Sequence, residues 1–157
     1  MNELTQKVGA ALKERGLMLV TAESCTGGWA AMEVTAIAGS SDWFERGYVT
    51  YSNAAKREAL GVAEETLERH GAVSEQTARE MAAGALKNGR GQVALAITGV
   101  AGPSGGSRDK PVGTVCFAWA HGSKISSQTR RFDGDRESVR RQSVLHALQG
   151  VLELLGK

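Results

Sequence analysis

The chain has 157 residues, 41% of them hydrophobic and 23% charged, with a formal net charge of +2. This length favours one globular domain, and a small net charge with only 5% aromatic residues argues against a nucleic-acid-binding protein. No apolar run reaches the length of a membrane span.

The N-terminus and the cysteines indicate the compartment. The first residues begin an amphipathic helix and lack the apolar core of a signal peptide. Cys25 and Cys116 lie far apart in the chain, with no second Cys or His at metal-ligand spacing. We therefore expect a cytoplasmic protein without a membrane anchor, disulfide, metal ion or cofactor.

The first third of the chain predicts helices alternating with strands. Leu4, Val8 and Leu12 recur at helical spacing, and Gly16 is placed to end that helix. The β-branched and aromatic run 47–51 is typical of a strand. The expected elements are a helix at 4–15, a strand at 17–22, a helix at 28–36, a turn at 37–41, a short helical piece at 42–46 and a strand at 47–51.

The rest of the chain carries clear helix signals and one strand of central character. Ser52 and Ser74 are placed as N-caps, and Gly71 as a helix stop. Residues 93–98 are nearly all apolar, as expected of a strand covered on both faces. The expected elements are helices at 54–60, 64–70 and 75–88, a strand at 93–98, a Gly-rich loop at 99–111, strands at 112–120 and 124–132, and a helix at 136–155.

These elements predict an α/β fold, specifically a three-layer α/β sandwich with a mixed central sheet flanked by helices. The sheet is expected to be mixed because its last two strands are joined by the short turn at 121–123 and form a hairpin. We expect one domain over residues 1–157.

The sequence changes abruptly from apolar to polar after the first predicted strand. Glu23, Ser24 and Thr26 arrive there, and Gly27 and Gly28 lead into the next helix. A helix N-terminus offers unpaired N–H groups and the positive end of a dipole, and glycines let a ligand approach the backbone. The simpler interpretation is a β–α turn that Thr26 caps.

Hydroxyls and one lysine are expected to meet at the same edge of the sheet. If the first and third strands are parallel neighbours, Ser24 and Thr98 share an edge, and Lys56 stands one turn into the helix that follows Tyr51. Such a cluster resembles a Ser–Lys nucleophilic site, in which a Lys of lowered pKa accepts the serine proton. The alternatives are capping hydroxyls and an exposed Lys. Cys25 is a rival nucleophile, but a small packed thiol is the favoured interpretation, because no His lies near it in sequence.

Two further features of the sequence, a Gly-rich loop and a pair of arginines, are candidates for binding an anion. The loop at 99–111 is rich in Gly and carries Arg108 and Lys110, although it matches neither a Walker loop nor a dinucleotide fingerprint. Arg136 and Arg140 are spaced i, i+4 on the last helix and together suit a phosphate or carboxylate. A surface loop without a ligand and a solvated helix face are the alternatives.

Six blocks of the sequence, in order along essentially the whole chain, resemble the CinA C-terminal domain family. The blocks are Ala22-Glu23-Ser24-Cys25-Thr26-Gly27-Gly28, Gly39-Ser40-Ser41, Thr50-Tyr51-Ser52-Asn53 with Lys56, Gly71-Ala72-Val73-Ser74, Ile97-Thr98-Gly99-Val100-Ala101-Gly102-Pro103 with Gly105-Gly106, and Lys110-Pro111-Val112-Gly113-Thr114-Val115. The resemblance implies a nicotinamide-nucleotide amidase of NAD recycling. Such an enzyme converts nicotinamide mononucleotide to nicotinate mononucleotide and ammonia with a Ser/Lys dyad and no metal.

The resemblance also implies site residues, and it leaves the nucleophile open between Ser24 and Ser41. The catalytic candidates are Ser24, Ser41, Tyr51, Lys56 and Thr98. The candidates for substrate binding are Glu23 (for the cationic pyridinium), Thr26, Gly27, Gly28, Asn53, Gly99, Gly102, Gly105, Gly106, Arg136 and Arg140. The alternative function is a regulatory module that binds a nucleotide without turnover, and a third is a purely structural partner domain. A homodimer or a higher homo-oligomer is the default expectation.

Overall fold

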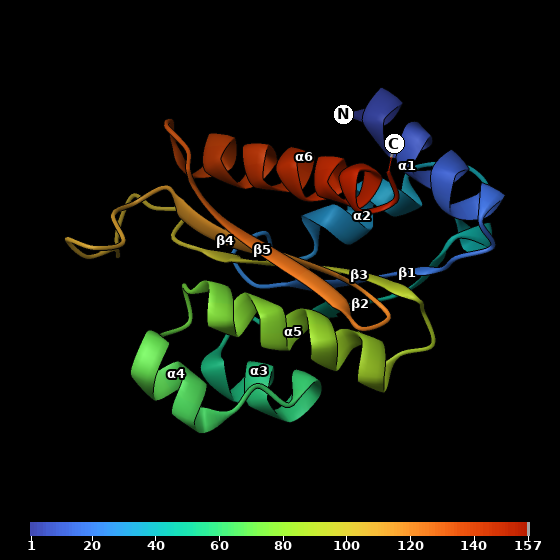
Figure 1. Cartoon of the computed structure of the whole chain (residues 1–157). Helices are drawn as coiled ribbons and strands as arrows, with labels where there is room; N and C mark the ends of the chain where they lie inside the picture. Colours follow the sequence, from blue (N-terminus) through green and yellow to red (C-terminus); the bar gives the residue numbers. More distant parts are fainter. Residues whose placement is uncertain (157) are drawn as a thin grey trace.

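The computed structural model describes residues 1–156 and is built on one five-stranded sheet in the order β2-β1-β3-β4-β5 (Figure 1). The strands are β1 (Leu19–Glu23), β2 (Phe44–Val49), β3 (Val93–Gly99), β4 (Thr114–His121) and β5 (Lys124–Arg131). β1 runs parallel to both β2 and β3, whereas β3, β4 and β5 pair antiparallel. The sheet is therefore mixed, as predicted, and β1 and β3 are the expected parallel neighbours.

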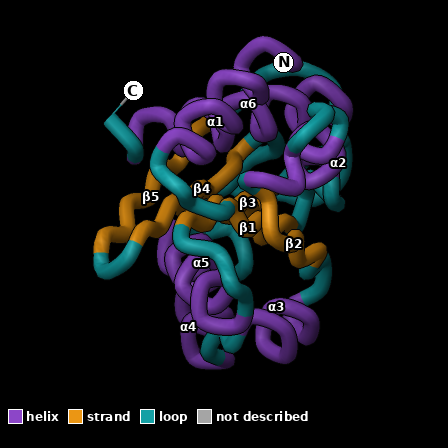
Figure 2. The backbone as a smooth tube through the Cα atoms, turned by 90° about the vertical axis from the view of Figure 1, so that its right-hand side faces the viewer, coloured by secondary structure: helices purple, strands orange, loops and turns teal. Residues whose placement is uncertain are grey.

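Helices cover both faces of this sheet, which confirms the three-layer sandwich (Figures 1 and 2). One layer contains α1 (Asn2–Glu14), α2 (Trp29–Thr35) and α6 (Arg136–Leu154). The other contains α3 (Asn53–Leu60), α4 (Glu64–His70) and α5 (Glu75–Asn88). Among the described residues, no helix combines the length and the apolar character needed to cross a membrane.

The central strand β3 shows why the two layers differ. Leu95 and Ile97 belong to the core beneath α1, α2 and α6, whereas Ala94 and Ala96 face the alanines of α5. Small side chains on that face let α5 approach closely. On another side, α5 packs closely on α3, because a Cβ at Gly84 would overlap the carbonyl oxygen of Leu60 at the end of α3.

Several predicted boundaries shift, and one element changes type. The short helical piece expected at 42–46 is wrong: a 3-10 turn, η1, occupies Ser40–Asp42, and β2 begins at Phe44. Pairing with β1 draws residues 44–46 into the sheet, through an irregularity opposite Leu19 and Val20. β4 begins at Thr114, two residues later than predicted, and α6 ends at Leu154.

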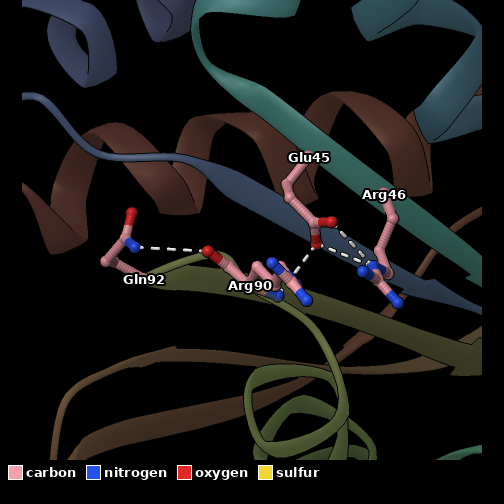
Figure 3. A network of polar contacts seen from close by, with 4 residues as sticks. All are labelled: Glu45, Arg46, Arg90 and Gln92. Atoms are coloured by element: carbon pink, nitrogen blue, oxygen red, sulfur yellow. Dashed lines mark hydrogen bonds and ion pairs between the residues drawn. The ribbon is translucent and has the colours of Figure 1, made fainter.

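The two edges of the sheet carry different polar groups. At the edge where β1 and β3 begin, Glu45 of β2 accepts hydrogen bonds from the Arg46 Nε (2.8 Å) and from the Arg90 backbone N–H (3.0 Å) (Figure 3). Gln92 adds a bond from its Nε2 to the Arg90 carbonyl oxygen at 3.3 Å. This network links β2, an outermost strand of the sheet, to the loop before β3. The opposite edge, where β1, β2 and β3 end, holds the connecting segments 24–28, 50–52 and 100–113.

Candidate active site

Ser24 begins the tight turn that joins β1 to α2. Its backbone N–H donates to the Ile97 carbonyl oxygen (2.9 Å), and its own carbonyl oxygen accepts from the Gly27 N–H (3.0 Å). Gly27 and Gly28 have φ values of 58° and 102°, a region that side chains rarely adopt. The two glycines thus let the chain pass from β1 to α2 through the five residues 24–28, with Ser24 directly after the end of the strand.

Lys56 lies in the first turn of α3, which Ser52 caps by accepting a hydrogen bond from the Ala55 N–H at 3.0 Å. Although it is a lysine, Lys56 is only 1% exposed. Its Nζ lies 2.9 Å from the Ser24 Oγ. The same nitrogen donates to the carbonyl oxygens of Thr50 (2.9 Å) and Tyr51 (3.1 Å).

The surroundings of Lys56 favour the neutral amine. Burial lowers the pKa of Lys56 from its usual value, because water that would solvate the ammonium is excluded. No carboxylate of the described residues forms an ion pair with it. A neutral amine retains two N–H donors for the two carbonyl oxygens, and its lone pair is then left for the Ser24 hydroxyl. This is the arrangement that a general base requires.

A pocket of 220 Å³ opens over this pair. Its lining residues come from all the segments at this edge of the sheet: Ser24, Cys25, Tyr51, Lys56, Ala72, Val73, Thr98, Gly99, Ala101 and Arg136. A larger hollow of 710 Å³ lies along α1 beside Gln149 and Leu152 of α6, but no nucleophile paired with a base lines it. The smaller pocket is therefore the candidate active site.

Tyr51, Arg136 and Thr98 line the same pocket as the serine–lysine pair, and the hydrogen bonds of their side chains go to other groups. The Tyr51 hydroxyl accepts from the Arg136 Nη2 at 3.2 Å, and the Arg136 Nη1 donates to the Gly102 carbonyl oxygen at 2.8 Å. The buried Thr98 hydroxyl donates to the Ala72 carbonyl oxygen at 2.9 Å. Thr98 therefore holds the wall of the pocket formed by residues 72 and 73.

Cys25 lines the same pocket with a buried thiol, 5% exposed. Burial raises the pKa of the Cys25 thiol to about 12. The thiol is therefore protonated at neutral pH and is a poor nucleophile. This supports the interpretation of Cys25 as a packed side chain.

Glu23 and Thr26 do not face the pocket, so the expectation that they contact a substrate needs correction. The Glu23 side chain is 0% exposed and accepts hydrogen bonds from the Ala30 N–H (2.9 Å) and the Ala31 N–H (3.1 Å) at the start of α2. The Thr26 hydroxyl donates to the same carboxylate at 2.6 Å. Along β1, side chains alternate between faces, and Glu23 points toward the α2 layer while Lys56 approaches from the α3 layer.

Ser41 lies at the opposite edge of the sheet and does not join the site. It is an exposed residue of η1, just before β2 begins at Phe44. Phe44 pairs with Leu19 at the start of β1, whereas Ser24 follows Glu23 at its end. Five residues of strand therefore separate the two serines, which is about 15 Å at the usual rise.

Arg140 also departs from its expected role in an arginine clamp. Its Nε donates to the Cys25 carbonyl oxygen and its Nη2 to the Thr26 carbonyl oxygen, both at 3.1 Å. Its guanidinium carbon lies 5.4 Å from the centroid of the Trp29 ring. Arg140 is thus engaged with the turn after Ser24, whereas Arg136 lines the pocket.

The remaining predicted residues are glycines and one asparagine. Gly99 lines the pocket and Gly102 supplies the carbonyl oxygen that holds Arg136. Asn53, Gly105 and Gly106 are exposed, and both glycines have positive φ values in the loop. The residue-by-residue prediction missed Ala72, Val73 and Ala101, although all three lie within the blocks that carried the family resemblance.

The fold and the site together define an α/β protein with a candidate serine–lysine site at the end of its parallel strands. Within residues 1–156 no group of three or more His, Cys, Asp or Glu side chains is placed to hold a metal ion. The chain belongs to the CinA C-terminal domain family, whose model matches residues 1–155.

Named relatives agree with this assignment. The chain is 59% identical to the nicotinamide-nucleotide amidohydrolase PncC of Escherichia coli strain K12, over 94% of this chain and 90% of that protein. It is 51% identical to the protein of the same name from Pseudomonas putida, over 96% and 94%. The crystal structure of the competence/damage inducible protein CihA from Agrobacterium tumefaciens matches with a TM-score of 0.94 and 46% identity, over 99% and 95%.

Proposed function

We propose that the protein is a nicotinamide-nucleotide amidase that hydrolyses nicotinamide mononucleotide to nicotinate mononucleotide and ammonia in NAD recycling. The observation that carries the proposal is the buried contact of 2.9 Å between the Ser24 Oγ and the Lys56 Nζ at the base of a pocket. The names of the relatives from Escherichia coli and Pseudomonas putida supply the substrate.

The first half of the reaction forms an acyl-enzyme. Neutral Lys56 accepts the Ser24 proton as the Oγ attacks the carboxamide carbon, and the carbonyl oxygen becomes an oxyanion. Lys56, now an ammonium, returns that proton to the amide nitrogen. The C–N bond breaks, ammonia leaves, and the nicotinoyl group remains on Ser24 as an ester.

The second half uses water in place of the serine. Lys56 accepts a proton from water, which attacks the ester carbon, and it then protonates the departing Ser24 Oγ. The free enzyme and a carboxylic acid result, and the acid loses its proton to solvent, where ammonia takes one up as ammonium. One water is therefore consumed for each ammonia released. The hydrogen bonds of Lys56 to Thr50 and Tyr51 hold its nitrogen in place through both halves.

Tyr51 and Arg136 are placed to bind the nucleotide part of the substrate. Tyr51 is 61% exposed at the mouth of the pocket, and Arg136 is an exposed cation held beside it by Gly102. An aromatic face suits the pyridinium ring, and a guanidinium suits the phosphate. These assignments make Arg136 the residue that distinguishes a nucleotide from a nucleoside.

The decisive experiment measures ammonia release from nicotinamide mononucleotide by the purified chain, with EDTA present. Stoichiometric ammonia and nicotinate mononucleotide support the proposal. Binding of the nucleotide without ammonia release would instead support a regulatory module. We further propose that residues 1–157 act as one catalytic domain, in the cytoplasm and without a nucleic-acid partner. We also propose that the protein is a homodimer, which size-exclusion chromatography with light scattering tests.

A further inference from the structure

Three successive carbonyl oxygens after α4 are held by side chains from different parts of the fold. The oxygen of His70, the last residue of α4, accepts a hydrogen bond from the Lys110 Nζ at 2.5 Å. The Gly71 oxygen accepts from two hydroxyls at the start of α5, at 3.0 and 2.8 Å. The Ala72 oxygen accepts from the Thr98 hydroxyl of β3 at 2.9 Å. The segment that leads into the wall of the pocket is therefore fixed from three directions.

Lys110 supplies the connection between this segment and the loop 100–113, which joins β3 to β4. Among the described residues, no other hydrogen bond joins that loop to α4 or to residues 71–73. A cation is favourable here, because the last carbonyl groups of a helix lack partners within the helix and carry the negative end of its dipole. The backbone of Lys110 is fixed by a turn with Ser107, whose N–H donates to the Lys110 carbonyl oxygen at 2.9 Å and whose Oγ accepts from the Lys110 N–H at 3.1 Å.

Contacts within the loop 100–113 extend from Lys110 to Arg136. Val112, two residues after Lys110, packs against Gly102, where a Cβ would overlap the Val112 side chain. The Gly102 carbonyl oxygen accepts from the Arg136 Nη1 at 2.8 Å. The loop therefore links the end of α4, next to one wall of the pocket, with an arginine that lines another part of it.

We infer that Lys110 is a positioning residue for the phosphate of the substrate, because it fixes the loop whose Gly102 carbonyl oxygen orients the Arg136 guanidinium. This inference rests on the proposed function, which assigns the phosphate to Arg136, and deepens it. Arg136 lines the pocket, whereas Lys110 is not among the lining residues. Lys110 therefore acts through Arg136 and does not touch the phosphate.

Kinetics of Lys110→Met test this role, because methionine keeps an unbranched side chain and removes the donor. A hydrogen bond to a charged group is worth about 10–100-fold in affinity, and loss of its orientation forfeits part of that. KM for nicotinamide mononucleotide should therefore rise about 3–10-fold, while kcat stays within about twofold. Lys110→Arg should restore KM, since it keeps a cationic donor. Lys124→Met is the matched control, since Lys124 is an exposed lysine at the start of β5 and its loss removes the same charge.

Binding of the product isolates the phosphate. Calorimetry gives dissociation constants for nicotinate mononucleotide and for nicotinate riboside, which is the same compound without its phosphate. Lys110→Met should weaken binding of the nucleotide alone, by about 3–10-fold. In an Arg136→Ala background the same substitution should change nucleotide affinity by less than about twofold, because the residue that Lys110 positions is then absent.

Three results would overturn the inference. Unchanged KM in a folded Lys110→Met protein would show that the lysine has no part in recognition. Equal weakening of nucleotide and nucleoside would give it a merely structural role. A full loss of nucleotide affinity from Lys110→Met in the Arg136→Ala background would instead indicate direct contact with the phosphate.

If Lys110→Met does not fold, the same ratio of nucleotide to nucleoside affinity is measured in Lys110→Gln. Glutamine retains a neutral donor and should show a smaller selective loss, and an unchanged ratio would again count against the inference. Failure of the proposed function is distinct, because the wild-type chain would then release no ammonia, whereas calorimetry requires no turnover.

Discussion

The most direct test of the proposed chemistry is Lys56→Met. Methionine keeps an unbranched side chain of similar length in the buried space that Lys56 fills, and it removes the amine that lies 2.9 Å from the Ser24 Oγ. Loss of a general base costs about 10²–10⁴ in rate. Because no second base approaches the Ser24 hydroxyl within the described residues, we expect kcat to fall by at least about 10²-fold.

The same substitution has two opposing effects on stability. The carbonyl oxygens of Thr50 and Tyr51 lose their Lys56 donor, and an unsatisfied buried acceptor costs about 1–3 kcal/mol. Against this, a buried amine whose pKa is lowered by desolvation is itself unfavourable at neutral pH, and methionine removes that cost. The net change should be small, so that lost activity reports the lost base rather than unfolding.

The assay follows ammonia and nicotinate mononucleotide together, with thermal unfolding recorded on the same sample. Lys87→Met, an exposed lysine near the end of α5, is the matched control and should keep the wild-type rate. Lys56→Arg should be inactive as well, because a guanidinium stays protonated. A folded Lys56→Met protein that keeps more than about a tenth of the wild-type rate would refute Lys56 as the base.

Three further predictions follow from the same geometry. Ser24→Ala should lower kcat about as far as Lys56→Met, with little further loss in the double variant, whereas Ser41→Ala should stay close to the wild-type rate; a large loss from Ser41→Ala alone would return that serine to the mechanism. The neutral form of Lys56 increases with pH and its pKa is lowered, so kcat/KM should rise toward a plateau below pH about 10.4, and a profile that is flat or falls over this range would contradict a lysine base. Glu23→Gln should lower the free energy of unfolding by about 1–3 kcal/mol in urea titrations, because the carboxylate accepts hydrogen bonds from the Thr26 hydroxyl and from two N–H groups at the start of α2; unchanged stability would show that these bonds contribute little.

The sequence was sufficient for the fold because its local signals agree with one another. Ser52 and Ser74 cap the helices that they were predicted to cap, and α4 and α5 have the predicted bounds. The apolar run of β3 marked the central strand, and the hairpin of β4 and β5 made the sheet mixed. Each of these features depends on neighbours in the chain or on a simple pattern of burial.

The sequence predicted the position of a site residue only where that residue closely follows the end of a strand. Ser24 and Lys56 meet because β1, β2 and α3 bring their adjoining segments to one edge, which the polar clusters after the strands indicated. Ser41 failed to join them because the length of β2 and its pairing place η1 at the other edge. The direction of Glu23 depends on which face of β1 it occupies, and a shift of one residue in the strand would reverse it.

Arg136 and Arg140 of α6 lie about one helical turn apart and contact different parts of the site. Spacing of i, i+4 places Arg136 and Arg140 on the same face of the helix, which is why the sequence indicated a joint clamp. Asp135 caps α6 by accepting from the Ser138 N–H at 2.9 Å, so that Arg136 is its first residue and stands at the mouth of the pocket. Arg140 lies about 6 Å further along the axis, where it meets the backbone after Ser24 instead of the pocket. Both cations belong to the same helix, so α6 contacts both the turn that follows Ser24 and the entrance of the pocket.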